Sequence, residues 1–236
     1  QVSSAASDVY KRQLDHSGKI QLLINSGEID ELYLKLFEHF DIGDIIAING
    51  EIIKTKKGEL SIKVNQTTIL SKSLRTFPEK WHGLKDKETR FRQRYLDLIV
   101  NPESKKILEI RSDVVKLFRE YLHSIEFIEV ETPILQSKAG GAIAKPFQTH
   151  HNALNLDMYL RIAPELYLKR LVIGGFEKVF EIGKIFRNEG IDQTHQPEFT
   201  MLESYQAYAD MNIVMDMVEN MSVSYTHLRA HETHEN

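Results

Sequence analysis

The sequence contains no cysteine, and this single absence excludes several kinds of chemistry. A disulfide scaffold, a thiol nucleophile and a cysteine-ligated zinc site all require that residue. A chain without cysteine also fits a reducing compartment. We therefore expect a cytoplasmic protein.

Long apolar runs and a large net charge are lacking as well. No apolar segment approaches the roughly 18 residues that a membrane-spanning helix needs, so we expect no membrane partner. We expect no signal peptide either, because no basic and then apolar leader follows Gln1. The net charge of -4 argues against a general nucleic-acid coat but leaves a local basic face possible.

What is present is the composition of an ordinary globular protein, with 42% hydrophobic and 27% charged residues. The 236 residues suffice for one large domain or two modest ones with hydrophobic cores. The two ends differ in character from the periodic sequence between them. Both resemble peptides that recur at the ends of translated sequencing reads, so we expect a non-native leader over 1–13 and a non-native tail over 222–236.

Residues 14–75 read as strand, helix, strand, turn and strand. A strand over Ile20–Ile24 precedes the helix, and a turn at Lys57-Gly58 separates the last two strands. The expected apolar positions are Ile29, Leu32, Leu36 and Phe40 on the helix, and Ile46, Ile48, Ile52, Leu60, Ile62 and Val64 on the strands. A small β-barrel lacking its first strands and an α+β sandwich fit this pattern equally well.

Residues 76–100 form a charged connector in which Phe91 and Tyr95 alternate with basic residues. Such a run is typically a solvated face. A face that contacts RNA or another domain is the alternative.

A second domain opens at Asn101-Pro102-Glu103, which is typical of a helix start. A further helix should begin at Pro164 and end at Gly174-Gly175. Two strands follow, about 179–187 and 198–208, and their short connection favours an antiparallel hairpin.

The face of this hairpin is chemically mixed. Residues two apart on a strand share a face, so Arg187 and Glu189 point the same way. Charges buried dry and unpaired would be costly. On spacing alone, a solvated ligand floor and a salt-bridged outer face are equally compatible with the pattern.

Several runs resemble a known enzyme class. Phe186-Arg187-Asn188-Glu189, followed by residues 195–199, resembles motif 2 of the class II aminoacyl-tRNA synthetases, and residues 127–133 resemble their motif 1. Within that class, residues 146–154 and 161–169 resemble the lysyl-tRNA synthetases. The similarity extends from about Leu14 to Met221.

The resemblance implies an α+β fold with two incomplete domains. An oligonucleotide-binding (OB) β-barrel for the anticodon would occupy 14–75, a charged linker 76–100, and an antiparallel catalytic sheet flanked by helices 101–221. Motif 3 of the class is not found in the sequence. We therefore expect an internal fragment that is itself inactive.

The implied activity is that of a lysine-tRNA ligase. ATP would activate lysine to lysyl-adenylate with release of pyrophosphate, and the lysyl group would then pass to the 3′ end of tRNA(Lys). The implied partners are tRNA(Lys), lysine, ATP, Mg²⁺ and a second copy that dimerises through the motif 1 region. No metal ligand is expected within this chain.

The resemblance also assigns roles to individual residues. Arg187 would be catalytic, because its guanidinium fork can bridge the substrate carboxylate and the α-phosphate. The ATP-binding residues would be Arg187, Asn188, Glu189, His195, Gln196 and Phe199. The lysine-binding residues would be Gly141, Glu165, Arg187, Glu203 and Tyr205.

Three other functions compete with this interpretation. An aspartate or asparagine synthetase shares the layout, but Glu165 and Glu203 suit a substrate with two ammonium groups. A paralogue that lysylates a protein usually lacks the N-terminal barrel, and the strands expected over 44–70 count against it. A non-catalytic RNA-binding fragment is the third, and the presence of Arg187 with Glu189 counts against it for the parent gene.

Overall fold

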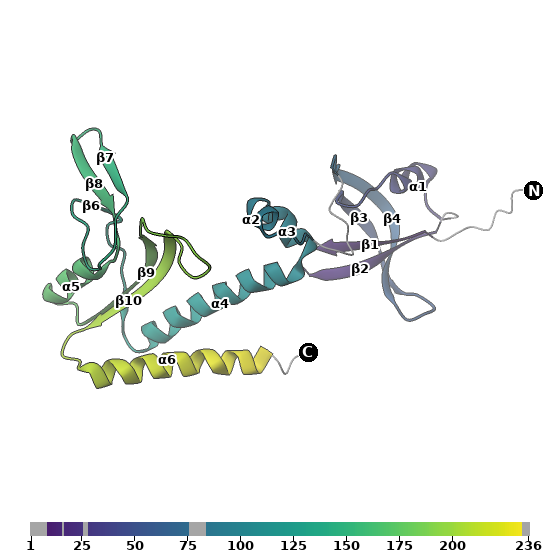
Figure 1. The fold of residues 1–236 in the computed structure, drawn as a ribbon. Helices are drawn as coiled ribbons and strands as arrows, with labels where there is room; N and C mark the ends of the chain where they lie inside the picture. The colour runs from purple at the N-terminus through teal and green to yellow at the C-terminus, as the bar shows by residue number, and fades with distance from the viewer. Residues whose placement is uncertain (1–8, 16, 26–27, 76–83, 233–236) are drawn as a thin grey trace, which may run out of the picture. The chain divides into compact units, whose positions relative to one another are not determined.

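The computed structural model describes residues 9–15, 17–25, 28–75 and 84–232, and the chain divides into two compact units, 1–105 and 106–236 (Figure 1). The fold is of the α+β class. Most of the expected non-native leader and residues 76–83 of the expected linker lie outside the described residues. Within the described ranges, no helix combines the length and the apolar character needed to cross a bilayer.

The first unit is built on a four-stranded sheet in the order β1-β2-β4-β3. The strands are β1 (Val9–Asp15), β2 (Gly18–Ile24), β3 (Ile45–Lys54) and β4 (Leu60–Ser71). The β1–β2 and β3–β4 pairs are antiparallel, whereas β2 and β4 pair in parallel. The predicted turn at Lys57-Gly58 is confirmed, and Gly58 adopts a φ of +82° there. Among the described residues this sheet stays open, without closing into a barrel.

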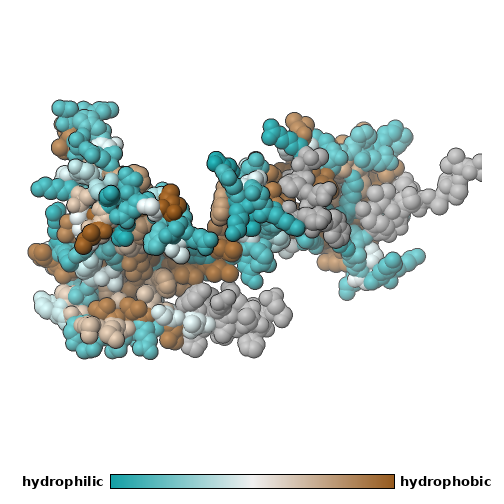
Figure 2. Space-filling view, viewed as in Figure 1, coloured by the Kyte–Doolittle hydropathy of each residue, from teal (hydrophilic) through white to brown (hydrophobic). Residues whose placement is uncertain are grey.

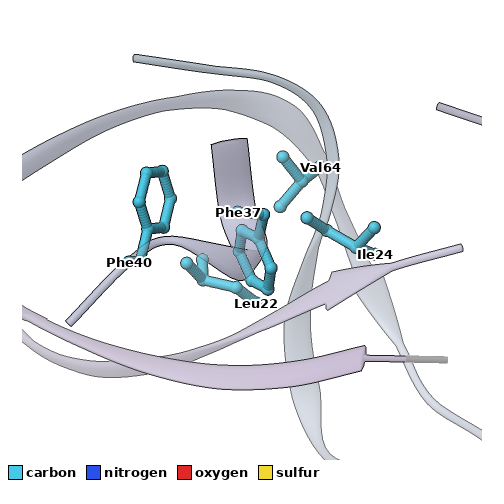
Figure 3. Close-up of a cluster of buried hydrophobic side chains, with 5 residues drawn as sticks. All are labelled: Leu22, Ile24, Phe37, Phe40 and Val64. Carbon is cyan, nitrogen blue, oxygen red and sulfur yellow. The ribbon is translucent and has the colours of Figure 1, made fainter. Parts of the chain in front are cut away.

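The core of the first unit lies between this sheet and α1 (Glu31–Glu38). Figure 3 shows Phe37 and Phe40 gathered with Leu22, Ile24 and Val64. The predicted apolar face of the helix is wrong at Leu32, which is 69% exposed. The reason is geometric: Leu32 lies about 140° around the helix axis from the buried Phe37.

The strand prediction for the first unit is wrong at two positions. Ile52 is 72% exposed, and it lies beyond a register shift between Asn49 and Gly50. Such a bulge increases the local twist of a strand and turns later side chains away from the core. Leu60 is also exposed, at 53%, while its neighbour Ser61 is fully buried.

The described part of the charged connector is helical and contains a buried acidic residue. This part forms α2 (Lys87–Arg92) and α3 (Arg94–Val100), which meet at Gln93, and the buried Asp97 lies within α3. The carboxylate of Asp97 accepts hydrogen bonds from Arg90 Nε at 2.6 Å, Arg94 Nη1 at 2.7 Å and Asn101 Nδ2 at 2.7 Å. Phe91 and Tyr95 are exposed, so the connector is a solvated face built around one buried acid.

In the second unit, the predicted antiparallel hairpin is confirmed. It pairs β9 (Lys178–Phe186) with β10 (Glu198–Gln206), and the short β5 (Ile128–Glu129) adds to β9 in parallel. A separate sheet, in the order β6-β8-β7, contains β6 (Leu135–Gln136), β7 (Gln148–His151) and β8 (Leu156–Leu160). The predicted helix is α5 (Glu165–Ile173), with Pro164 and Gly174 as its caps.

Two long helices complete the fold: α4 (Pro102–Ser124) and α6 (Met211–Glu232). Leu122 from α4 and Met217 from α6 pack with Phe180 of β9 in the core of the second unit. Apolar side chains also remain on the surface of α4 and of the first turns of α6, as Figure 2 shows. Because α6 runs to Glu232, it includes much of the segment expected to be a non-native tail, and that expectation stays a prediction.

Candidate active site

The hairpin places Arg187 directly after the end of β9. Its backbone N–H donates to Pro197 O at 2.8 Å, which closes the end of the β9–β10 ladder. Its guanidinium lies over the ring of Phe199, 5.2 Å from the centroid, an arrangement that a cation–π attraction favours. Arg187 Nη2 reaches Ile162 O at 3.5 Å, a long and weak bond.

Arg187 also carries an unused donor. Its Nε is buried and has no hydrogen-bond partner in the part of the chain that the structure describes. Buried polar atoms in folded proteins are nearly always satisfied, so an orphan donor here indicates a place for an external acceptor. A carboxylate or phosphate oxygen would satisfy both the donor and the positive charge.

A carboxyl and a phenol lie further along β10. Tyr205 Oη donates to Glu203 Oε2 at 3.1 Å. Burial raises the pKa of Glu203, and the nearby carboxylates of Glu165 and Glu181 raise it further. Burial, together with the Glu203 carboxylate, also raises the pKa of Tyr205. Negative charge is therefore concentrated here, and a cation would relieve it.

Glu165 opens α5, which directs its carboxylate toward this group. Lys169, one helical turn later, places its ammonium 2.5 Å from Glu165 Oε1 and 5.9 Å from the ring centroid of Tyr205. Gly141 lies against the same residue with a φ of +87°: a Cβ at this position would stand 3.0 Å from Glu165 Cβ and 3.1 Å from Ala163 Cβ. The structure thus brings together Gly141, Glu165, Tyr205 and Glu203, and their assignment to lysine binding stays a prediction.

The remaining predicted residues occupy the loop between β9 and β10. Asn188 N donates to Lys145 O at 2.7 Å, and Glu189 Oε1 accepts from Lys145 N at 3.2 Å. These contacts join the hairpin loop to the segment that follows Gly141. Asn188 and Glu189 therefore lie next to the Arg187 end of the site.

His195 and Gln196 contact their own loop instead. His195 Nδ1 lies 2.7 Å from Asp192 Oδ2, and Gln196 Nε2 donates to Asp192 O at 3.1 Å. The His195 side chain is 75% exposed. The described side-chain hydrogen bonds of His195 and Gln196 are thus made within their own loop, and their assignment to ATP stays a prediction.

Sequence reasoning missed the polar group beneath the site. Arg161 and Glu181 are only 2% and 4% exposed, and Arg161 Nη1 lies 2.5 Å from Glu181 Oε1. One signal was available, because Glu181 belongs to the same alternating set on β9 as Arg187. The register places Glu181 opposite Glu203, so the mixed face of the hairpin is half-buried around an internal ion pair.

Two surface hollows of the second unit lie away from this group. One is lined by residues at the start of α6, including Met211, Met215 and Val218. Another lies on β7 and β8 beside His150, whose Nδ1 is 2.8 Å from Asp157 Oδ1. Neither hollow contains the titratable group around Glu203, so chemistry rather than concavity identifies the candidate site.

Comparison with known proteins adds an independent line of evidence. Residues 86–235 match the family described as tRNA synthetases class II (D, K and N), and residues 14–70 match the OB-fold nucleic acid binding domain. The chain is 58% identical to a lysine–tRNA ligase of Clostridium botulinum and 57% identical to one of Clostridium tetani, in both cases over 207 residues, or 88% of this chain. A lysine–tRNA ligase of Carboxydothermus hydrogenoformans is 58% identical over the same length. The chain spans 41% of the two clostridial relatives and 42% of the third.

Proposed function

The chain belongs to the class II tRNA synthetases of the D, K and N group, and from that premise we propose that it carries the lysine-activating site of a lysine–tRNA ligase. The reaction would join the lysine carboxylate to the α-phosphate of ATP, with pyrophosphate as the leaving group. The lysyl group would then pass to the 3′ end of tRNA(Lys). The curated relatives that the chain matches are lysine–tRNA ligases, which supports this substrate.

One observation carries the choice of lysine. The ammonium of Lys169 lies between Glu165 and the ring of Tyr205, so a primary ammonium on an alkyl chain is already accommodated there. Glu203 adds a second carboxyl beside Tyr205. Free lysine carries two such ammonium groups, and these two carboxyls could each neutralise one of them.

Arg187 would act by position and charge. The attacking carboxylate and the α-phosphate are both anionic and repel each other, so a guanidinium that binds both brings them together. Its unused Nε donor is available to an incoming oxygen. The proposed role of Phe199 is to stack on the adenine ring, which contributes about 1–3 kcal/mol per base in single-stranded nucleic acids.

ATP is the proposed nucleotide, and Mg²⁺ its proposed companion ion. The described residues contain no group of three or more His, Cys, Asp or Glu side chains able to hold a metal. These residues therefore do not form an all-protein cage for Mg²⁺, which usually binds through one or two carboxylates together with substrate phosphates, and no step of the reaction is assigned to the ion.

The proposal extends to partners and location. The first unit, whose residues 14–70 match a nucleic-acid-binding OB-fold, would bind the anticodon of tRNA(Lys). The exposed Ile107, Leu108 and Ile110 on α4 support a homodimer through this helix and the adjoining motif 1 segment. The absence of cysteine supports a cytoplasmic location.

The decisive test is calorimetric titration of the chain with L-lysine, L-aspartate and L-norleucine. We expect binding of lysine only, because norleucine lacks the side-chain ammonium and aspartate reverses the charge. The Glu203→Gln variant should lose most of this binding. Glu198→Gln is the matched control, since Glu198 is on the same strand and pairs with Lys184 at an exposed position. Preferential binding of aspartate would favour the aspartate or asparagine enzymes, and binding of RNA without any amino acid would favour a non-catalytic module.

A further inference from the structure

We propose that Arg161 is a positioning residue for Arg187. It would not touch lysine or ATP, but its buried guanidinium would fix the backbone on which the Arg187 side chain rests. The proposal rests on the function proposed above, in which Arg187 binds the reacting groups.

Arg161 ties three segments of the second unit together. Its Nη1 contacts Glu181 Oε1 at 2.5 Å and Thr132 O at 3.2 Å, and its Nε donates to Lys184 O at 2.8 Å. Thr132 Oγ1 accepts from the same Nη1 at 3.1 Å and donates to Glu181 Oε2 at 2.6 Å. The guanidinium of Arg161, which directly follows β8, thereby links the segment after β5 to Glu181 and Lys184 on β9.

The backbone of Arg161 leads directly to Arg187. Its carbonyl accepts from Phe186 N at 3.0 Å, and Phe186 is the residue before Arg187. The next carbonyl, that of Ile162, is the one that Arg187 Nη2 reaches. A shift of the Arg161 side chain would therefore move both the strand end that carries Arg187 and the acceptor of its guanidinium.

The space around the Arg161 guanidinium admits no additional side chain at position 183. A Cβ on Gly183 would lie 2.2 Å from Arg161 Nη2, so any other side chain there would push the guanidinium aside. Arg161→Lys could place an ammonium near Glu181, but a single ammonium lacks the separate donor atoms of a guanidinium and could not also reach Lys184 O and Thr132.

Stability alone does not account for this arrangement. A buried ion pair recovers little more than the cost of taking its charges out of water, and an apolar pair of similar size often serves stability as well. What the guanidinium of Arg161 supplies is a fixed position for its four hydrogen-bond acceptors, which are Lys184 O, Thr132 O, Thr132 Oγ1 and Glu181 Oε1. The backbone of Arg161 is hydrogen-bonded to Phe186, the residue before Arg187, so the position of Arg187 would depend on this fixed arrangement.

The test is NMR of the chain with ¹⁵N-labelled arginine, which needs no substrate. In the wild type, the Nε–H signal of Arg187 should show the ring-current shift of Phe199, and Phe199→Leu should remove that shift. Arg161→Lys should remove most of it as well. Arg119→Lys is the matched control, because Arg119 makes a two-bond ion pair with Glu129 in the same unit, at 2.7 and 2.9 Å, without contacting Arg187.

The outcomes separate positioning from general support of the fold. The proposal is overturned if Arg161→Lys folds and leaves the Arg187 signal in place, or if Arg119→Lys moves it equally. Should Arg161→Lys fail to fold, Thr132→Val takes its place. It removes the hydroxyl between Arg161 and Glu181 and keeps the shape, and an unchanged signal in that variant also overturns the proposal.

A parallel titration with lysine keeps the two proposals distinct. If the wild type binds no lysine, the proposed function fails, while the Arg187 signal still reports whether Arg161 holds that side chain. If lysine binds and Arg161→Lys weakens its binding at least about tenfold, the lower end of the loss seen when residues that support metal ligands are changed, positioning and function are supported together.

Discussion

Gly141 and Glu165 approach so closely that a Cβ on residue 141 would stand 3.0 Å from Glu165 Cβ and 3.1 Å from Ala163 Cβ, and a neighbour would have to shift to admit it. Gly141 also has a positive φ, which disfavours any other residue by about 1–2 kcal/mol. We expect the same contact to restrict the Glu165 side chain, so this single glycine should affect both the fold and the candidate site.

The Gly141→Ala variant should lose stability by about 1–2 kcal/mol and should also lose lysine affinity. Gly175→Ala is the matched control, because Gly175 has a φ of +104° in the same unit and open space where a Cβ would stand. Both variants should lower the free energy of unfolding, and only Gly141→Ala should weaken lysine binding in calorimetry. Equal lysine affinity in the two variants would show that the Gly141 contact does not orient Glu165.

Lys169→Met should strengthen lysine binding by about twofold. The Lys169 ammonium competes with the ligand for Glu165, and an exposed ion pair one helical turn apart contributes about 0.3–0.5 kcal/mol. The control is Lys35→Met, which removes an equivalent pair with Glu31 on α1 and should leave lysine affinity unchanged. Weaker binding by Lys169→Met would mean that Lys169 assists the ligand rather than competing with it.

Glu203 should make the stability of the second unit depend on pH. Burial raises the pKa of Glu203 above its ordinary 4.5, so the folded state binds more protons than the unfolded state just above that value. Stability from this group therefore falls as pH rises from the ordinary pKa through the raised one. Glu203→Gln should remove that fall in a series of urea unfolding curves across this range. A slope unaffected by the substitution would exclude Glu203 as its source.

Asp97 should contribute stability with the opposite sign. Burial alone would raise its pKa, but hydrogen bonds from Asn101, Arg90, Ser104 and Arg94 prevail and hold it well below 3.8. The contribution is thus present above the ordinary aspartate pKa and lost as pH falls through the lowered value. Asp97→Asn should lower the Tm of the first unit near neutral pH.

The control for Asp97 is Glu88→Gln, which removes the exposed pair between Glu88 and Arg92 on α2. Exposed pairs contribute little, so its Tm should stay close to that of the wild type. Equal losses in the two variants would contradict a special role for the buried acid.

The sequence was most informative where local signals decide the structure. Pro164 and Gly174 bound α5 as predicted, because proline fixes φ at the start of the helix and glycine tolerates the positive φ of +104° that Gly175 adopts just past its end. The β9–β10 hairpin followed from the short loop between its strands. The grouping of Glu165 with Glu203 followed from the family resemblance, since nothing local joins residues on α5 and β10.

The errors arose where tertiary contacts decide instead. The choice between Leu32 and Phe37 depends on which side of α1 meets the sheet, and periodicity alone does not define that side. The exposure of Ile52 depends on a bulge in the pairing of β3 with β4. Arg161 follows β8 and Glu181 lies on β9, which belongs to another sheet, so no spacing along the chain indicates that the two residues pair.

The internal ion pair also has a consequence for the order of folding. The β9–β10 pairs join residues 12 to 28 positions apart, and the Arg161–Glu181 contact spans 20 positions, whereas the contact between Thr132 and Glu181 spans 49. Closing longer loops costs more entropy and slows the contacts that depend on them. We therefore expect the hairpin to form early, with Arg187 still unanchored, and the binding groups to reach their final places only when the last long-range contacts close.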